Sequence, residues 1–108
     1  LVDLGEAERA AKVRAERYAR AVTYAERAVE LMPTSAEAHF HLARALGRTA
    51  LEKGPRDRVK YADRIRSHAE RAIALDPRHA GALHVLGIWH AEIMRLNGFS
   101  RAFARTFL

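Results

Sequence analysis

The segment AERAVELMP at residues 25–33 returns as AERAIALDP at residues 69–77, with six of its nine positions identical. The two copies lie 44 residues apart. At the same offset, SAEAHFHLARAL at residues 35–46 aligns with HAGALHVLGIWH at residues 79–90. Two successive segments that repeat in one register indicate an internal repeat, and periods of this size are typical of stacked structural units. The sequence therefore predicts a tandem-repeat protein.

The composition indicates that each repeat unit is helical. Ala and Leu dominate an apolar fraction of 49%, and only three prolines and six glycines interrupt the 108 residues. Pro33 and Pro77 end helices, because the residue before a proline is pushed out of the α region, and Ser35 is a suitable N-cap for the next helix. We expect helices at residues 1–4, 6–32, 36–52, 56–75, 80–96 and from 100 onward, with turns that include Gly5, Gly54, Pro55, Asn97 and Gly98.

The expected fold class is all-α, a tandem array of antiparallel helix pairs in a single domain of residues 1–108. The apolar stripe of such a pair is buried only against its partner helix and the next pair, so one pair alone lacks a sufficient core. We expect the end of repeat 1 at residues 1–34, repeat 2 at 35–78 and the start of repeat 3 at 79–108. The chain therefore looks like a piece of a longer array.

The repeat residues resemble those of the tetratricopeptide repeat (TPR), whose unit of about 34 residues favours fixed side-chain sizes at fixed positions. That family favours a large residue at position 4, Leu at 7, a small residue at 8, Ala at 20 and 27, an aromatic at 24 and Pro at 32. The resemblance implies a right-handed α-solenoid. The matching residues are His39, Leu42, Ala43, Leu83, Leu86 and Gly87 in first helices, and Ala21, Ala28, Ala72, Pro33 and Pro77 in second helices.

The chain also departs from the TPR pattern. Ala25 and Ala69 stand where the pattern has an aromatic residue, Ile65 stands at a position that favours Ala, and the period of 44 residues is longer than usual. The surplus falls at residues 47–64, so we expect each second helix to be lengthened at its start. This lengthened form, with HAERAIALDP, HAGALHVLGIWH and GFSRAFARTFL, is similar to the regulator of microtubule dynamics family and its bacterial relatives. That resemblance implies protein binding, microtubule association or lipid contact.

The net charge of +6 comes from sixteen Arg and three Lys against thirteen acidic residues. A basic surplus is compatible with nucleic acid, anionic lipid or acidic peptide partners. Here the acidic residues are interleaved with Arg along the helices, which favours solvated faces with pairs of opposite charge. Nucleic-acid binding is not favoured, because no aromatic residue is interleaved with a basic stripe in a known recognition module.

The sequence offers no catalytic, cofactor or metal motif. It has no GxSxG, no phosphate-binding glycine-rich loop and no cysteine. His39 and His41 point about 200° apart on a helix, and His84 and His90 have no acidic partner at ligand spacing. We therefore expect a non-enzymatic protein without cofactors or a native metal. With no signal or membrane span in the given chain, its location stays open.

The TPR resemblance implies a concave groove lined by the first helix of each pair. Arg44 and Arg48, four residues apart on one helix face, are suited to bind a carboxylate or phosphate of a partner. The alternative is that both are solvated or paired with Glu37 and Glu52. The expected peptide-binding residues are Glu37, Phe40, Arg44, Arg48, His84, Ile88 and Glu92, whereas Leu83, Val85, Leu86, Ile88 and Trp89 recur at the spacing of a helical core.

Three phenylalanines, Phe99, Phe103 and Phe107, fall four residues apart near the end of the chain. Flanked by Arg101 and Arg105, they suit an anionic membrane surface. A repeat interface that packs on Trp89 or on a second copy of the chain is the favoured interpretation, because an uncapped solenoid end exposes apolar surface.

Three functions follow as hypotheses. The leading one is a scaffold that binds a peptide or helix segment of a partner protein in the concave groove. The alternatives are binding to an anionic lipid surface and a purely structural, self-assembling module, with a homo-oligomer formed through uncapped repeat ends. The sequence does not identify the protein partner.

Overall fold

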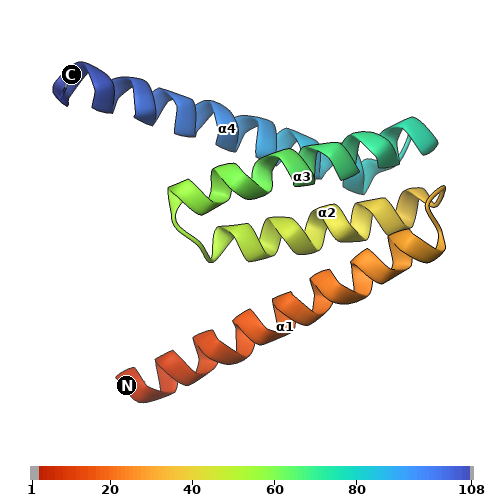
Figure 1. Cartoon of the computed structure of the whole chain (residues 1–108), viewed down its shortest axis with the longest axis horizontal. Coiled ribbons are helices and arrows are strands. Elements are labelled where there is room, and N and C mark those ends of the chain that lie inside the picture. The colour runs from red at the N-terminus through yellow and green to blue at the C-terminus, as the bar shows by residue number, and fades with distance from the viewer. Residues whose placement is uncertain (1–2, 108) are drawn as a thin grey trace.

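The computed structural model describes the backbone of residues 3–107 and the side chains of that range except those at 99, 100, 103, 104 and 107. This part of the chain forms four helices and no strand: α1 (Leu4–Leu31), α2 (Ala36–Leu51), α3 (Pro55–Leu75) and α4 (Ala80–Phe107). The helices lie in chain order, and successive helices run in opposite directions (Figure 1). The prediction of an all-helical fold is confirmed for these residues.

Local capping residues set the start of each helix. The Asp3 side chain accepts a hydrogen bond from the backbone N–H of Glu6 at 2.8 Å, and the Ser35 hydroxyl accepts one from the N–H of Ala38 at 3.2 Å. Such caps satisfy backbone donors that have no partner within the helix. α3 begins with Pro55, whose missing N–H and fixed φ suit the first turn.

Two predicted turns are wrong. Gly5 lies in the first turn of α1, because the Asp3 cap starts the helix before it. Asn97 and Gly98 lie inside α4, which continues to Phe107 as one helix instead of ending near Leu96. A glycine in a helix costs only about 1 kcal/mol relative to Ala, and no described glycine adopts the positive φ that would end a helix.

The core is built around α2, which packs against α1, α3 and α4. Its contact with α3 is the most extensive, and Leu46 and Ile65 are completely buried there. Burial of one such aliphatic side chain contributes roughly 1.5–3 kcal/mol. Alanines fill much of the remaining core and let the helix backbones approach closely. The buried core residues are Ala25, Leu42, Ala43, Leu46, Ala50, Ala62, Ile65, Ala69, Val85 and Trp89.

His39 is buried, as predicted, and joins three segments of the fold. Its Nε2–H donates to the carbonyl oxygen of Pro33 at 2.8 Å, so its Nδ1 accepts from Nδ1–H of His68 at 3.0 Å. Burial lowers the pKa of His68, and the neighbouring His39 and Arg64 lower it further. His68 is therefore neutral near pH 7, and its hydrogen bond to His39 connects the start of α2 to the second half of α3.

The contact between α2 and α4 depends on two glycines. A Cβ added at Gly47 of α2 would lie 2.9 Å from Nε1 of Trp89, and a Cβ added at Gly81 of α4 would lie 2.7 Å from the ring of Phe40. Each helix thus presents an aromatic ring to a glycine of the other helix. The glycines are required here because of this close approach and not because of an unusual backbone conformation.

The predicted core of α4 is only partly correct. Trp89 and Val85 are buried, with Trp89 only 3% exposed, and Leu86 is partly buried. Leu83 and Ile88, in contrast, are exposed to 48% and 45%. These two residues lie on sides of α4 that the described helices do not cover, so their apolar character does not place them in the core.

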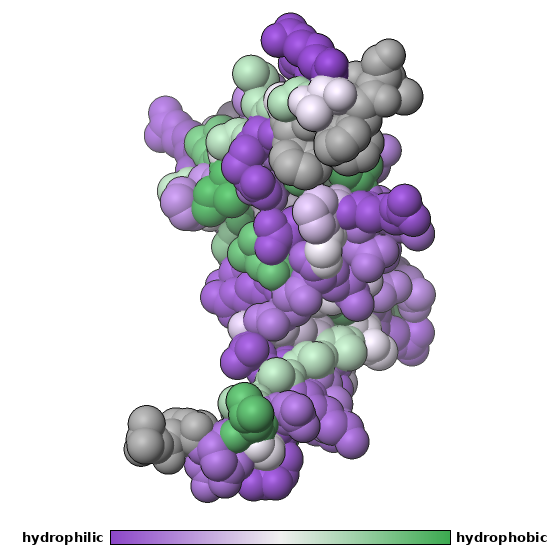
Figure 2. Space-filling model, turned by 90° about the vertical axis from the view of Figure 1, so that its left-hand side faces the viewer, coloured by the Kyte–Doolittle hydropathy of each residue, from purple (hydrophilic) through white to green (hydrophobic). Residues whose placement is uncertain are grey.

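The first half of α1 extends away from the rest of the molecule (Figure 1). All residues from 6 to 17 are exposed, and the space-filling view shows this arm at the bottom, with a mixed hydrophilic and apolar surface (Figure 2). One contact ties the arm to the body, an ion pair between Arg14 and Glu52 at 2.9 Å.

Substitution of Gly47 by Ala tests the contact between α2 and α4. Ala is favoured over Gly in a helix by roughly 0.5–1 kcal/mol, but overpacking against buried Trp89 costs about 1–3 kcal/mol. We expect Gly47→Ala to lower the free energy of unfolding, measured by urea denaturation with circular dichroism.

Gly87→Ala is the matched control, because a Cβ at this helical position would meet nothing within 4 Å. In dilute solution it should raise the free energy of unfolding by roughly 0.5–1 kcal/mol. If both substitutions stabilise the protein, Trp89 does not pack on Gly47 as described.

Candidate functional site

A groove of about 290 Å³ lies between α2 and α4. Its position follows from the glycine contacts, which bring the two helices together while the side chains above them diverge. Five of the seven predicted peptide-binding residues line it. The lining residues are Phe40, Ala43, Arg44, Gly47, Arg48 and Leu51 of α2, with Gly81, His84, Val85, Ile88 and Trp89 of α4.

The floor and the rim of the groove differ in chemistry. The floor is made by buried Ala43, Gly47, Val85 and Trp89. The rim consists of side chains that recur every four residues, because residues four apart share one face of a helix. Along α2 these are Phe40, Arg44 and Arg48, and along α4 they are His84 and Ile88. An apolar floor with a basic rim suits a segment that carries both an apolar side chain and a negative charge.

The two rim arginines do not take part in any ion pair among the side chains that the structure describes. Arg44 contacts Nδ1 of His41 at 3.1 Å, and its guanidinium lies 5.2 Å from the centroid of the Phe40 ring. The carboxylates expected to neutralise them have other partners. Glu52 binds Arg14, and Glu37 binds His79 and His41.

Glu37 closes one end of the groove and does not line it. The Nδ1 of His79 accepts a hydrogen bond from the N–H of Ala82 at 3.1 Å, so its Nε2–H is free to donate to Glu37. The ring of Phe40 packs on the same imidazole, with centroids 4.8 Å apart. His79 therefore caps the start of α4 and fixes it against α2.

Glu92 lies outside the groove, on the side of α4 that faces α3. Its carboxylate accepts hydrogen bonds from Arg95 at 2.6 Å and from Arg58 at 3.1 Å. Arg58 also donates to the carbonyl oxygens of Leu51, the last residue of α2, and of Lys53, two residues further on. These contacts give Glu92 a structural role in joining α2, α3 and α4.

Sequence reasoning missed several groove residues. Gly47, Gly81 and Leu51 carry no motif, and only the TPR preference for small residues at helix contacts could have indicated the glycines. Trp89 was predicted as core, and it also forms the floor of the groove. The side chains of Phe99, Phe103 and Phe107 lie outside the described residues, so the structure does not place the predicted stripe.

Two searches of the described residues gave negative findings. No group of three or more His, Asp, Glu or Cys side chains in this part of the chain is arranged to hold a metal ion. No helix in the same part combines the length and the apolar character needed to cross a membrane.

Comparison with known proteins gave one family. A family model described as "Regulator of microtubule dynamics protein 1-3" matches residues 1–108. The chain is similar to regulator of microtubule dynamics protein 1 of Bos taurus, with 32% identity over 85 residues, 79% of this chain and 27% of the relative. The proteins of that name from Mus musculus and Homo sapiens are each 31% identical over 85 residues, again 79% of this chain, and 28% and 27% of the relatives.

The chain thus spans little more than a quarter of the length of these curated relatives. No solved structure matches it.

The Glu92 contacts predict a dependence of stability on pH. Hydrogen bonds from Arg95 and Arg58 lower the pKa of Glu92, against an opposing effect of burial. A lowered pKa in the folded state means that the stabilisation is complete above the ordinary value of about 4.3 and is lost as pH falls through the lowered value. We expect Glu92→Gln to lower the free energy of unfolding by about 1 kcal/mol at pH 7, and the difference from the unsubstituted chain to shrink below pH 4.

Urea denaturation at several pH values measures this difference. Glu70→Gln is the control, because Glu70 is an exposed glutamate of α3 that forms no ion pair with the described residues. A difference for Glu92→Gln that stays constant from pH 7 to pH 3 would contradict the assignment.

Proposed function

Because the chain belongs to the regulator of microtubule dynamics protein 1-3 family, we propose that it is a non-enzymatic scaffold that binds a segment of a partner protein. The binding site in this proposal is the groove between α2 and α4. The four helices are part of a TPR-like right-handed α-solenoid with a 44-residue period. Residues 1–34 end repeat 1, residues 35–78 form repeat 2, and residues 79–108 begin repeat 3.

In this arrangement α2 and α4 are the first helices of successive pairs, and α1 and α3 are second helices. The second helices α1 and α3 have 28 and 21 residues, and the first helices α2 and α4 have 16 and 28, so length alone does not distinguish the two kinds. The groove then lies on the concave side of the array. An array of this kind also leaves apolar faces at its ends, so self-association belongs to the same proposal.

The main support for the proposal is the position of Arg44 and Arg48 above the apolar floor of the groove. Arg44 and Arg48 face the groove without a described carboxylate partner, so they are available for charge-assisted hydrogen bonds to a ligand. Trp89 and Ile88 offer apolar surface beside them. The expected ligand is a protein segment with acidic side chains next to an apolar anchor.

The family name makes microtubules the first partner to test. The relatives that carry this name are much longer than this chain, so an action of this chain on microtubules is part of the proposal. The competing lipid hypothesis depends on Arg101, Arg105 and the phenylalanines between and around them. No contact of the described residues favours it, and the experiment below separates the two.

The experiment is co-sedimentation of the chain with microtubules polymerised from purified tubulin, in parallel with flotation on vesicles that contain phosphatidylserine. Reversal of both groove charges in Arg44→Glu/Arg48→Glu should weaken microtubule binding at least about tenfold, because two charge-assisted contacts are replaced by repulsion. The matched control is Arg101→Glu/Arg105→Glu, which reverses two exposed charges at the same spacing on α4.

The control variant should bind microtubules nearly as well as the unsubstituted chain. If both variants lose binding equally, the attraction reflects net charge and not the groove. If the unsubstituted chain binds vesicles but not microtubules, and only the Arg101→Glu/Arg105→Glu variant loses that binding, the lipid hypothesis replaces this one.

A further inference from the structure

A second hollow, of about 310 Å³, lies between α1 and α2. It is lined by residues of both helices, and Arg44 and Arg48 of α2 line it as well as the groove between α2 and α4. Tyr24 stands beside it with 74% of its surface exposed. An exposed apolar surface of this kind is normally covered by another helix or by a binding partner. The lining residues are Tyr18, Ala21, Tyr24, Ala25 and Ala28 of α1, with His41, Arg44, Ala45 and Arg48 of α2.

The internal repeat shows which kind of element fits this hollow. A shift of 44 residues relates α1 to α3 and α2 to α4. Within the molecule, α2 rests on α3 and also contacts α4. An equivalent helix on α1 and α2 would occupy the hollow, just as α2 occupies the space beside α3 and α4.

The surface of α1 that borders the hollow has side chains suited to pack against a helix, and we call this surface the seat. Tyr18, Ala21, Ala25 and Ala28 correspond to Ala62, Ile65, Ala69 and Ala72, all four of which are buried in α3. The α1 residues are more exposed, with only Ala25 buried. These α1 residues thus present to solvent the surface that the equivalent α3 residues bury.

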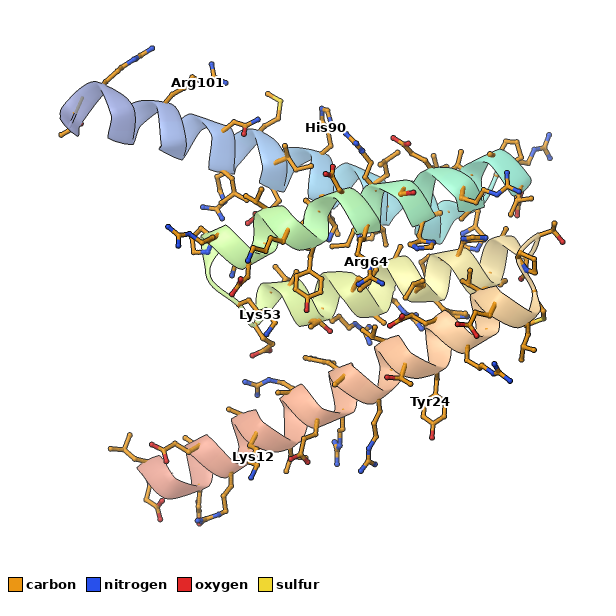
Figure 3. All side chains as sticks on the ribbon, in the orientation of Figure 1. Lys12, Tyr24, Lys53, Arg64, His90 and Arg101 are labelled. Atoms are coloured by element: carbon orange, nitrogen blue, oxygen red, sulfur yellow. The ribbon has the colours of Figure 1, made fainter. Side chains whose placement is uncertain are left out.

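The helix that matches α2 is α4. Buried His39 and Ala50 of α2 correspond in α4 to Leu83 and Met94, which are exposed to 48% and 61%. In Figure 3, His90 points outward from α4 and Tyr24 points outward from α1, at opposite ends of the stack of helices. One end of the molecule thus carries the seat, and the other end carries the helix face that fits it.

One pair of positions makes the match specific. Inside the molecule, His39 of α2 contacts His68 of α3. A shift of 44 residues turns His39 into Leu83 and His68 into Tyr24. The polar pair of His39 and His68 is thereby replaced by Leu83 and Tyr24, whose side chains can pack through apolar surface, and both of these residues are exposed, one on α4 and one on α1.

We propose that α4 of one copy of this chain docks in the hollow between α1 and α2 of a second copy, with Leu83 of the first packed on Tyr24 of the second. The contact repeats the interface between α2 and α3, so it rests on the helix-pair array proposed above. It is a head-to-tail contact between different surfaces, which lets further copies add at either end. Arg44 and Arg48 line both the hollow and the groove between α2 and α4, so the docked helix lies beside the two arginines proposed to contact the partner protein.

Static light scattering over a range of concentrations tests the contact. The mass of the unsubstituted chain should rise with concentration beyond that of a dimer. Tyr24→Glu removes the seat and Leu83→Glu removes the docking face, so each should weaken association at least about tenfold and leave monomers. Val59→Glu is the matched control, because Val59 is an exposed apolar residue of α3 outside both faces, and it should associate like the unsubstituted chain.

An equimolar mixture of the two variants gives the decisive result. The Tyr24→Glu copy keeps an intact α4 face and the Leu83→Glu copy keeps an intact seat, so the mixture should form dimers and stop at two copies. Ala21→Glu and Met94→Glu form a second pair with the same expected behaviour, should either first variant lose its helical circular dichroism.

Three results would overturn the proposal: an unsubstituted chain that stays monomeric to its solubility limit, single variants that still associate, or a mixture that stays monomeric. A monomeric chain would assign the hollow to a helix other than α4. Tyr24 and Leu83 do not line the groove between α2 and α4, so their substitution removes no residue of that groove.

Discussion

The reciprocal packing of two aromatic rings on two glycines fixes the geometry on which the rest of the structure depends. Trp89 lies against Gly47 and Phe40 lies against Gly81, so each contact reinforces the other. The contact is small compared with that between α2 and α3. It nevertheless sets the distance between α2 and α4, provides the floor of the groove between them, and holds Arg44 and Arg48 at its rim.

The main features of the fold could be predicted from the sequence because they are local. Proline after α1 and α3 and the helical spacing of apolar residues act over a few positions, and each occurs in both copies of the repeat. The cap before α2 is Ser35, and its equivalent before α4 is His79. The prediction of a turn at Asn97 and Gly98 was wrong for a local reason as well. A glycine ends a helix only when the chain adopts a positive φ there, and the sequence alone does not report that choice.

The candidate site was less predictable, because its geometry depends on residues far apart in the chain. Phe40, Arg44 and Arg48 follow from helical spacing alone, and they do line the groove. Glu92 lies four residues after Ile88, and the same spacing predicted that it would line the groove. Its carboxylate instead binds Arg58, 34 residues away in the chain, on the other side of α4. The glycine contacts and the apolar match of Leu83 with Tyr24 likewise appear only when the helices are placed side by side.

The central claim is that a partner protein occupies the groove between α2 and α4. The most direct measurement is photo-crosslinking to microtubules from a benzoylphenylalanine residue placed at Ile88 in the groove, compared with the same residue placed at Val59, an exposed site on α3. The account predicts adducts with tubulin from position 88 and few from position 59. Binding that gives adducts from position 59 and none from position 88 would contradict it.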